Sequence, residues 1–358
     1  MSAKPRPIRE GASRSALNLI FLFTVAGFMA VMFGVLFLTK AIGRLDLGDI
    51  RNSLSILALA LLILALAMSL EVMLFVPFAA YLRKRRFKLL SFAGFTNPGA
   101  GAGWLSVAAA FILFIANIAL INVFTPLFQL AGITPPPDPE PVIPVHGTAM
   151  YILVLLVEVA LVASVPAILE EFVFRGVLFR TMGASWRTAW VSAALFALMH
   201  VDLVTLPSKM AMGFALAAAF LLTRSLWAPV IMHFLNNTLA VVTERFIPMV
   251  SVQDASWQRD IVIWAGIAVV SGATLFGLLF VLKKVRERRD AAIRRRIESM
   301  LPAEKLGFEY TYIEPPVVAS FGNSRALHTP LWIAGGILAA STALMALGNC
   351  FHWFHAAP

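Results

Sequence analysis

Three short groups of polar residues stand inside otherwise apolar stretches of this sequence. The first is the segment 170–175, with two adjacent glutamates and an arginine; the second ends at His200, and the third joins His233 to Asn237. A charged side chain at the centre of a bilayer costs roughly 2.5–3.5 kcal/mol even on the most lenient insertion scale. Ionisable residues in such stretches are therefore candidates for function, and we expect these three groups to form one site.

Helical spacing separates the two glutamates by role. Glu171 and Arg175 are four residues apart and share one face of a helix, so they can form an ion pair. Glu170 is rotated by about 100° from Glu171 and faces a different neighbour. The spacing thus predicts one carboxylate held by the arginine and a second, Glu170, in an apolar setting as a candidate general base.

The two histidine groups supply the remaining parts of a hydrolytic site. Phe196 lies one turn before His200, and His233 shares a helical face with Asn237. A carboxylate and a histidine that activate water, with a histidine and an asparagine that donate to an oxyanion, are sufficient to hydrolyse an amide without a covalent nucleophile. Asn236 competes with Asn237 for the donor role, because the spacing from His233 allows either.

The composition places the chain among polytopic membrane proteins. Of 358 residues, 60% are hydrophobic and 13% are charged, and the mean hydropathy is +0.84. The net charge of +10 comes from basic clusters between apolar runs, which indicates membrane orientation and not nucleic-acid binding. The single cysteine, Cys350, excludes an intramolecular disulfide and a cysteine-ligated zinc site.

Apolar runs of roughly twenty residues, the length that spans a bilayer, predict an all-α transmembrane bundle of about eight core helices plus one C-terminal helix. The first run follows basic residues as a secretory signal does, but it is longer and lacks a small-residue cleavage site, so we expect it to be retained. The nine predicted runs are 16–39, 54–80, 103–125, 149–178, 187–203, 208–223, 227–247, 261–282 and 331–350.

The same pattern suggests three regions. Residues 1–148 hold the first helices and a proline-rich loop, 149–247 hold the polar groups, and 248–358 hold the last helices with a basic linker. The basic stretch 283–296 is expected to extend the preceding helix along the cytoplasmic surface.

Alternation of the runs across the membrane puts every basic cluster on one side. With a cytoplasmic N-terminus, the segments 83–88, 180–187 and 283–296 all lie inside the cell, as the positive-inside rule requires. Counted from that side at 1.5 Å per residue, Glu170, His200 and His233 lie roughly 18, 21 and 13 Å deep, and we expect them to converge inside the bilayer. We therefore expect a multi-pass protein of the cell membrane whose site is reached from the cytoplasm.

The ordered patterns EExxxR, FxxxH and HxxxN resemble the signature of the CAAX-protease and bacteriocin-processing family of intramembrane proteases, also called the CPBP or ABI family. One such pattern is weak evidence, but three in order within one hydrophobic region are specific. The resemblance covers about 149–247 and rests on Glu170, Glu171, Arg175, Phe196, His200, His233 and Asn237.

The resemblance implies an intramembrane endopeptidase. Glu170 and His200 would activate the attacking water, His233 and Asn237 would stabilise the oxyanion, and the arginine-paired glutamate would orient the site. The implied partners are the bilayer and a membrane-associated protein or peptide, with prenylated CAAX ends as one substrate class. Two histidines and two glutamates could also bind Zn²⁺, but HExxH spacing is absent, so we expect a metal-free mechanism with no cofactor.

Other interpretations use the same residues. The glutamates and Arg175 could be a structural ion pair near the interface, and His200 could be a helix-packing donor. Buried charges could also form the relay of a proton-coupled transporter, for which inverted repeats are expected and none is found in the sequence. Finally, the family contains immunity-type and scaffold members, although no motif residue is missing here.

Overall fold

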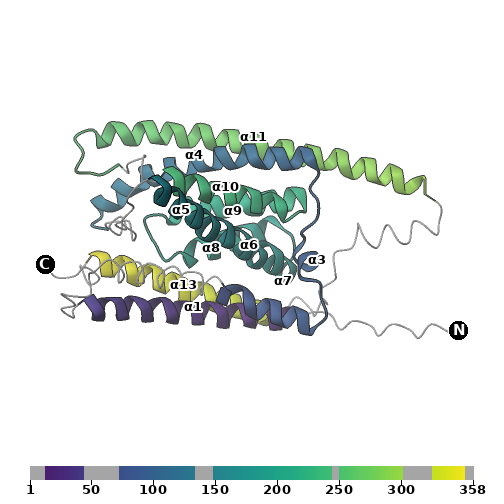
Figure 1. Ribbon diagram of the computed structural model, residues 1–358, viewed down its shortest axis with the longest axis horizontal. Coiled ribbons are helices and arrows are strands. Elements are labelled where there is room, and N and C mark those ends of the chain that lie inside the picture. The colour runs from purple at the N-terminus through teal and green to yellow at the C-terminus, as the bar shows by residue number, and fades with distance from the viewer. Residues whose placement is uncertain (1–12, 44–71, 134–147, 244–249, 301–324, 351–358) are drawn as a thin grey trace.

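The computed structural model describes residues 13–43, 72–133, 148–243, 250–300 and 325–350, and every regular element in these ranges is a helix (Figure 1). Six helical stretches of this described part are long and apolar enough to cross a membrane. The predicted all-α polytopic bundle is therefore confirmed. The six stretches are Arg14–Gly34, Ala100–Leu130, Ile152–Met182, Leu206–Thr223, Trp257–Arg296 and His328–Leu347.

Several long helices agree closely with the predicted runs. Helix α11 is much longer than its predicted membrane-spanning run, because it continues through the basic stretch 283–296 as one 42-residue helix. This continuation is the extension that the sequence predicted. Residues 54–71 of the second predicted run lie outside the described residues, while 72–84 are helical. The long helices are α1 (Arg14–Gly43), α4 (Ala100–Leu130), α9 (Leu206–Thr223), α11 (Trp257–Glu298) and α13 (Arg325–Cys350).

The helix that carries the glutamates is continuous but twice widened. Two π-helical segments interrupt its α-helical geometry, and Pro166 at the start of α6 lacks the N–H that would continue the normal ladder. Single π-helical turns inside α-helices are often found at functional sites. In chain order the segments are α5 (Thr148–Glu158), η1 (Val159–Ser164), α6 (Val165–Glu171), η2 (Phe172–Val177) and α7 (Leu178–Met182).

Helix α8 (Trp186–Met199) ends four residues earlier than the predicted run 187–203. The prediction was wrong here because apolar residues continue past the point where the backbone turns. Val201 has a left-handed φ of 53°, a strained conformation for a β-branched residue. Asp202 then accepts hydrogen bonds from Val204 N at 2.9 Å and from the hydroxyl of Thr205, the residue immediately before α9. His200 therefore lies at the C-terminal end of α8.

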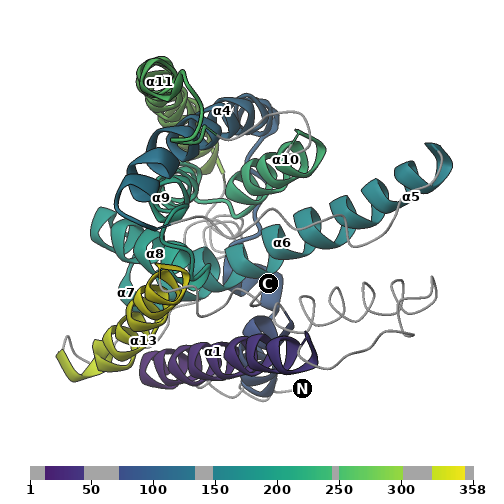
Figure 2. The same ribbon diagram turned by 90° about the vertical axis from the view of Figure 1, so that its left-hand side faces the viewer.

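The bundle has two outer helix pairs around a central group. Helix α4 runs beside α11 on one side, and α1 runs beside α13 on the other (Figures 1 and 2). Helices α8, α9 and α10 (Trp227–Thr243) lie between these pairs, and α6 approaches them from the side. Helix α5 projects away from the body in Figure 2, and its apolar side chains are exposed at Ile152, Leu153 and Leu156. Such a face suits lipid contact.

Two arginine side chains donate to backbone carbonyl groups of neighbouring helices. Arg180, in α7, donates to Phe92 O of the short helix α3 (Leu89–Ala93) at 3.0 Å. Arg286, in α11, donates to Leu221 O at 3.0 Å and Leu222 O at 3.3 Å, in the last turn of α9. Cations near a helix C-terminus satisfy its open carbonyl groups. Arg180 and Arg286 thus bind backbone carbonyl groups of α3 and α9.

Candidate active site

The predicted pair of Glu171 and Arg175 is confirmed as a buried ion pair. Arg175 Nη1 donates to Glu171 Oε1 at 2.7 Å, and both side chains have 0% exposure. The other terminal nitrogen, Nη2, donates to Gly213 O of α9 at 2.8 Å. The guanidinium also lies over the ring of Phe196 in α8, with Cζ 4.9 Å from the ring centroid. Arg175 thus joins the glutamate helix to α8 and α9.

The contact with Gly213 depends on close packing of α8 and α9. A Cβ atom built on Gly213 would lie 3.0 Å from Ala193 Cα and 3.1 Å from Phe196 Cδ1. The absence of a side chain therefore lets the two helices approach, as small residues do in membrane bundles. Sequence analysis did not single out Gly213, although a glycine inside an apolar helix is a signal of such an approach.

His233, which is 2% exposed, bridges the two glutamates. Its Nδ1 is 3.0 Å from Glu171 Oε1, and its Nε2 is 3.9 Å from Glu170 Oε2. A carboxylate that is paired with arginine only accepts hydrogen bonds, so His233 Nδ1 is the donor. The sequence placed this histidine with Asn237 and did not foresee its contact with the glutamates.

Glu170 lies beside this cluster and is 6% exposed. Besides His233, Lys209 acts on it: this lysine, in the first turn of α9, interacts electrostatically with Glu170 and with Asp202. Sequence analysis missed Lys209, although a lysine in an apolar 18-residue helix is itself a functional signal. Glu170 is thus the less enclosed of the two carboxylates, with Lys209 of α9 and His233 of α10 near it.

His200 joins the cluster through a shared aromatic ring. Its Nδ1 is 2.9 Å from Phe196 O, and because a carbonyl oxygen only accepts, Nδ1 carries the hydrogen. The Phe196 ring centroid is 5.0 Å from that of His200 and 5.7 Å from that of His233. His200 is exposed, whereas His233 is buried. The two histidines therefore flank one phenylalanine, and the lone pair of the neutral His200 ring is on Nε2.

The two adjacent asparagines of α10 have different surroundings. Asn236 is 4% exposed and accepts a hydrogen bond from Asn117 Nδ2 of α4 at 2.9 Å, as expected for an interhelical asparagine. Its own Nδ2 is 3.3 Å from Asn237 Oδ1. Asn237 is only half-buried. Of the two residues, Asn237 is therefore the more accessible, and Asn236 is the one enclosed between helices.

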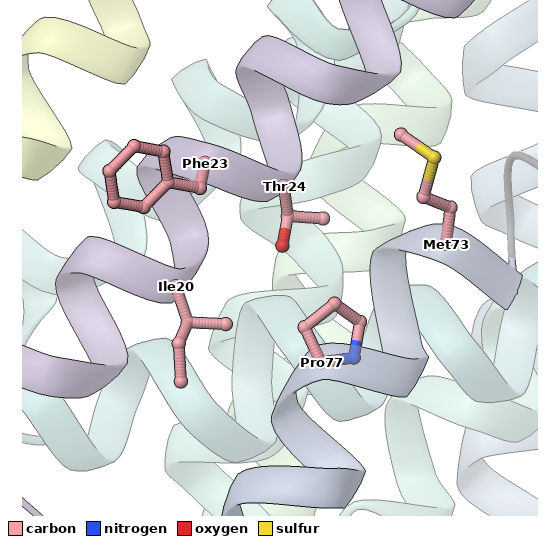
Figure 3. Close-up of a pocket in the computed structure, with 5 residues that line it drawn as sticks. All are labelled: Ile20, Phe23, Thr24, Met73 and Pro77. Atoms are coloured by element: carbon pink, nitrogen blue, oxygen red, sulfur yellow. The ribbon is translucent and has the colours of Figure 1, made fainter.

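Two further observations concern metal binding and cavities in the described part of the chain. Among the residues that the structure describes, no group of three or more His, Cys, Asp or Glu side chains is arranged to hold a metal ion. An apolar pocket of about 230 Å³ lies between α1 and the helical residues 72–84 (Figure 3). Its lining, which includes Ile20, Thr24 and Met73, contains no residue of the three polar groups.

Together, the fold and the cluster define a polytopic membrane protein with a buried carboxylate and histidine site. Residues 152–239 match the family model described as type II CAAX prenyl endopeptidase Rce1-like. This match to an Rce1-like CAAX protease family confirms the resemblance predicted from the sequence. All six candidate residues, from Glu170 to Asn237, lie inside the matched range.

Two curated proteins are similar to a part of the chain. YdiL of Bacillus subtilis (strain 168), whose name assigns it provisionally to the membrane peptidases, is 31% identical over 83 residues, which are 22% of this chain and 34% of YdiL. The membrane-embedded CAAX protease MroQ of Staphylococcus aureus (strain USA300) is 32% identical over 96 residues, 24% of this chain and 39% of MroQ. The chain thus matches little more than a third of either relative's length. No solved structure gives a significant match.

Proposed function

We propose that this protein is an intramembrane endopeptidase that hydrolyses a peptide bond of a membrane-associated protein with water activated by Glu170 and His200. The observation that carries the proposal is the single cluster in which His233 contacts both glutamates while sharing Phe196 with His200. The family match of residues 152–239 supports the reaction class.

Glu170 and His200 have the properties that water activation needs. His200 Nδ1 donates to Phe196 O, which leaves Nε2 with a lone pair that can accept a proton. His200 is exposed at the surface of the described bundle, and the proposal requires that water reach it there. Glu170 supplies the second acceptor, while Arg175 forms its ion pair with Glu171. As the water oxygen bonds to the scissile carbonyl carbon, its proton passes to Glu170 or His200.

His233 and Asn237 are proposed to stabilise the oxyanion that forms on the carbonyl oxygen. They are four residues apart on α10 and so share a face. His233 Nδ1 already uses its proton on Glu171, so donation to the oxyanion through Nε2 would require a second proton on the ring. When the carbon–nitrogen bond breaks, the proton taken from water is returned to the leaving amine, which balances the reaction without a covalent intermediate.

The relatives suggest the substrate class. MroQ is named a CAAX protease, and the family description refers to CAAX prenyl endopeptidases. A substrate of that class is anchored to the membrane by a lipid close to the bond that is cut. We propose that the substrate of this chain is a membrane-tethered peptide and that it enters from the side of the membrane where the basic segments lie. Whether the peptide must be prenylated is the variable to test.

A cleavage assay with purified protein in detergent tests the proposal. Pairs of membrane-tethered peptides that differ only in prenylation are incubated with the wild type and with Glu170→Gln. General acid–base catalysis contributes about 10²–10⁴ to a rate, so kcat should fall by that factor in the variant. Cleavage that survives a chelator supports the metal-free mechanism, whereas cleavage abolished by the chelator assigns the reaction to a metal.

The control is Glu287→Gln on the exposed surface of α11, which should cut as fast as the wild type. Thermal unfolding of each variant shows whether the protein is folded. A folded wild type that cuts no peptide across a broad panel would overturn the proposal and favour a scaffold role.

A further inference from the structure

We propose that Asn117 is a positioning residue that acts through Asn236 to turn the Asn237 amide so that its NH₂ group faces the substrate. This inference rests on the proposed function, because it explains how Asn237 becomes an oxyanion donor. Asn117 lies on α4, which carries none of the three motifs, and it is 119 residues from Asn236 in sequence.

The three amides form a directional chain of hydrogen bonds. Asn117 Nδ2 donates to Asn236 Oδ1 at 2.9 Å, and Asn236 Nδ2 donates to Asn237 Oδ1 at 3.3 Å. Each amide has one accepting end and one donating end, so a bond at one end fixes which end is left over. The Asn237 oxygen is occupied by Asn236, and the NH₂ group of Asn237 is therefore the end that can donate onward.

The sulfur of Met212 determines the direction of this chain of hydrogen bonds. Its sulfur, on α9, is 3.4 Å from Asn117 Nδ2 and 3.6 Å from Asn236 Nδ2. A thioether sulfur accepts weakly and cannot donate, so both amides turn their NH₂ groups toward it. If the chain ran the other way, Asn237 would present its oxygen, which would repel an oxyanion. Met212 is 1% exposed, and this sulfur therefore occupies a fixed place between α4, α9 and α10.

Burial restricts how the amide groups of Asn117 and Asn236 can be oriented. Asn117 and Asn236 are 8% and 4% exposed, so water does not compete freely for their amides. Asn117 Oδ1 has no hydrogen-bond partner among the described residues, and Asn117 therefore makes its bonds through Nδ2 alone. Its contacts are directed at Asn236 and Met212, which is the pattern expected of a residue whose role is to orient its neighbour.

Asn122 offers a matched control on the same helix. It is an equally buried asparagine, 1% exposed, but it accepts from Val250 N at 2.8 Å and donates to Ile118 O at 3.0 Å. These contacts tie α4 to the connection before α11 and not to the three-amide chain. Asn122→Leu therefore removes the same kind of group from the same helix without touching Asn237.

The first test measures orientation without catalysis. In protein labelled with ¹⁵N-asparagine, the side-chain NH₂ signal of Asn237 is assigned by its loss in Asn237→Ala. Asn117→Leu should shift or broaden this signal, and Asn122→Leu should leave it in place. An Asn237 signal unchanged by Asn117→Leu overturns the proposal, whether or not the protein cleaves peptides.

The second test measures the kinetic consequence. An oxyanion donor contributes about 10²–10³ to kcat, so a mobile Asn237 should cost about tenfold in kcat with KM unchanged. In an Asn237→Ala background the same Asn117→Leu change should have no further effect on kcat. Equal losses in both backgrounds would show a merely structural role and overturn the proposal. If the wild type cleaves nothing while the Asn237 signal moves, the proposed function fails and the amide chain stands.

Discussion

Arg175 Nη1 and Glu171 Oε1 are 2.7 Å apart, and neither side chain is accessible to solvent. A buried ion pair of this kind is costly to break on one side, because the remaining charge stays buried without its partner. Each member of the pair therefore depends on the other, because neither charge is tolerated in this buried position alone. The ion pair also explains why Glu171, unlike Glu170, is not assigned to the attacking water.

Arg175→Met should destabilise the protein strongly. Removing one partner of a buried ion pair costs about 3–5 kcal/mol, and here it leaves Glu171 as an uncompensated carboxylate. The double variant Arg175→Met with Glu171→Gln should recover part of that loss, because the stranded charge is gone. Unfolding free energies in detergent and SDS mixtures measure both. Additive losses in the double variant would contradict the coupling inferred from the 2.7 Å contact.

Gly213→Ala should separate α8 from α9. The added methyl group would lie 3.0 Å from Ala193 Cα, and the Gly213 carbonyl would move away from Arg175. Overpacking of this kind costs about 1–3 kcal/mol, and we expect a matching loss of unfolding free energy with lower kcat. Gly266→Ala on α11 is the control, since nothing lies within 4 Å of a Cβ there. Equal stability of the two variants would contradict the prediction.

The tautomer of His200 can be checked directly. Because Nδ1 is bonded to Phe196 O, the neutral ring should carry its proton on Nδ1 and a lone pair on Nε2. ¹⁵N chemical shifts of labelled histidine distinguish the two nitrogens, with His200→Gln used for assignment. That variant should also lose about 10²–10⁴ in kcat. A proton found on Nε2 would exclude His200 as the acceptor of the water proton.

The orientation in the membrane is a further prediction. Lys284 and Gln253 lie toward opposite ends of the α11 region, and both are exposed. In a Cys350→Ser background, an impermeant maleimide added to intact cells should label Gln253→Cys, while Lys284→Cys should be labelled only after lysis. This result follows if the basic segment 283–296 faces the cytoplasm. The reverse pattern would place the N-terminus outside.

Local spacing determined much of the candidate site. The four-residue separation of Glu171 and Arg175 made their pairing predictable, because side chains at that spacing meet on any helix. The apolar runs likewise determined the all-helical class, since a membrane leaves few other ways to satisfy the backbone. These features depend on periodicity alone, and so a single sequence contained them.

Only the tertiary structure decided which faces meet. His233 contacts Glu171 across 62 residues of sequence, and Asn117 reaches Asn236 across 119. The contact between Gly213 and Arg175 depends on how closely α8 approaches α9, and the end of α8 depends on the left-handed turn at Val201. Helix periodicity fixes which residues share a face, but the partner of each face is set by the packing of the whole bundle.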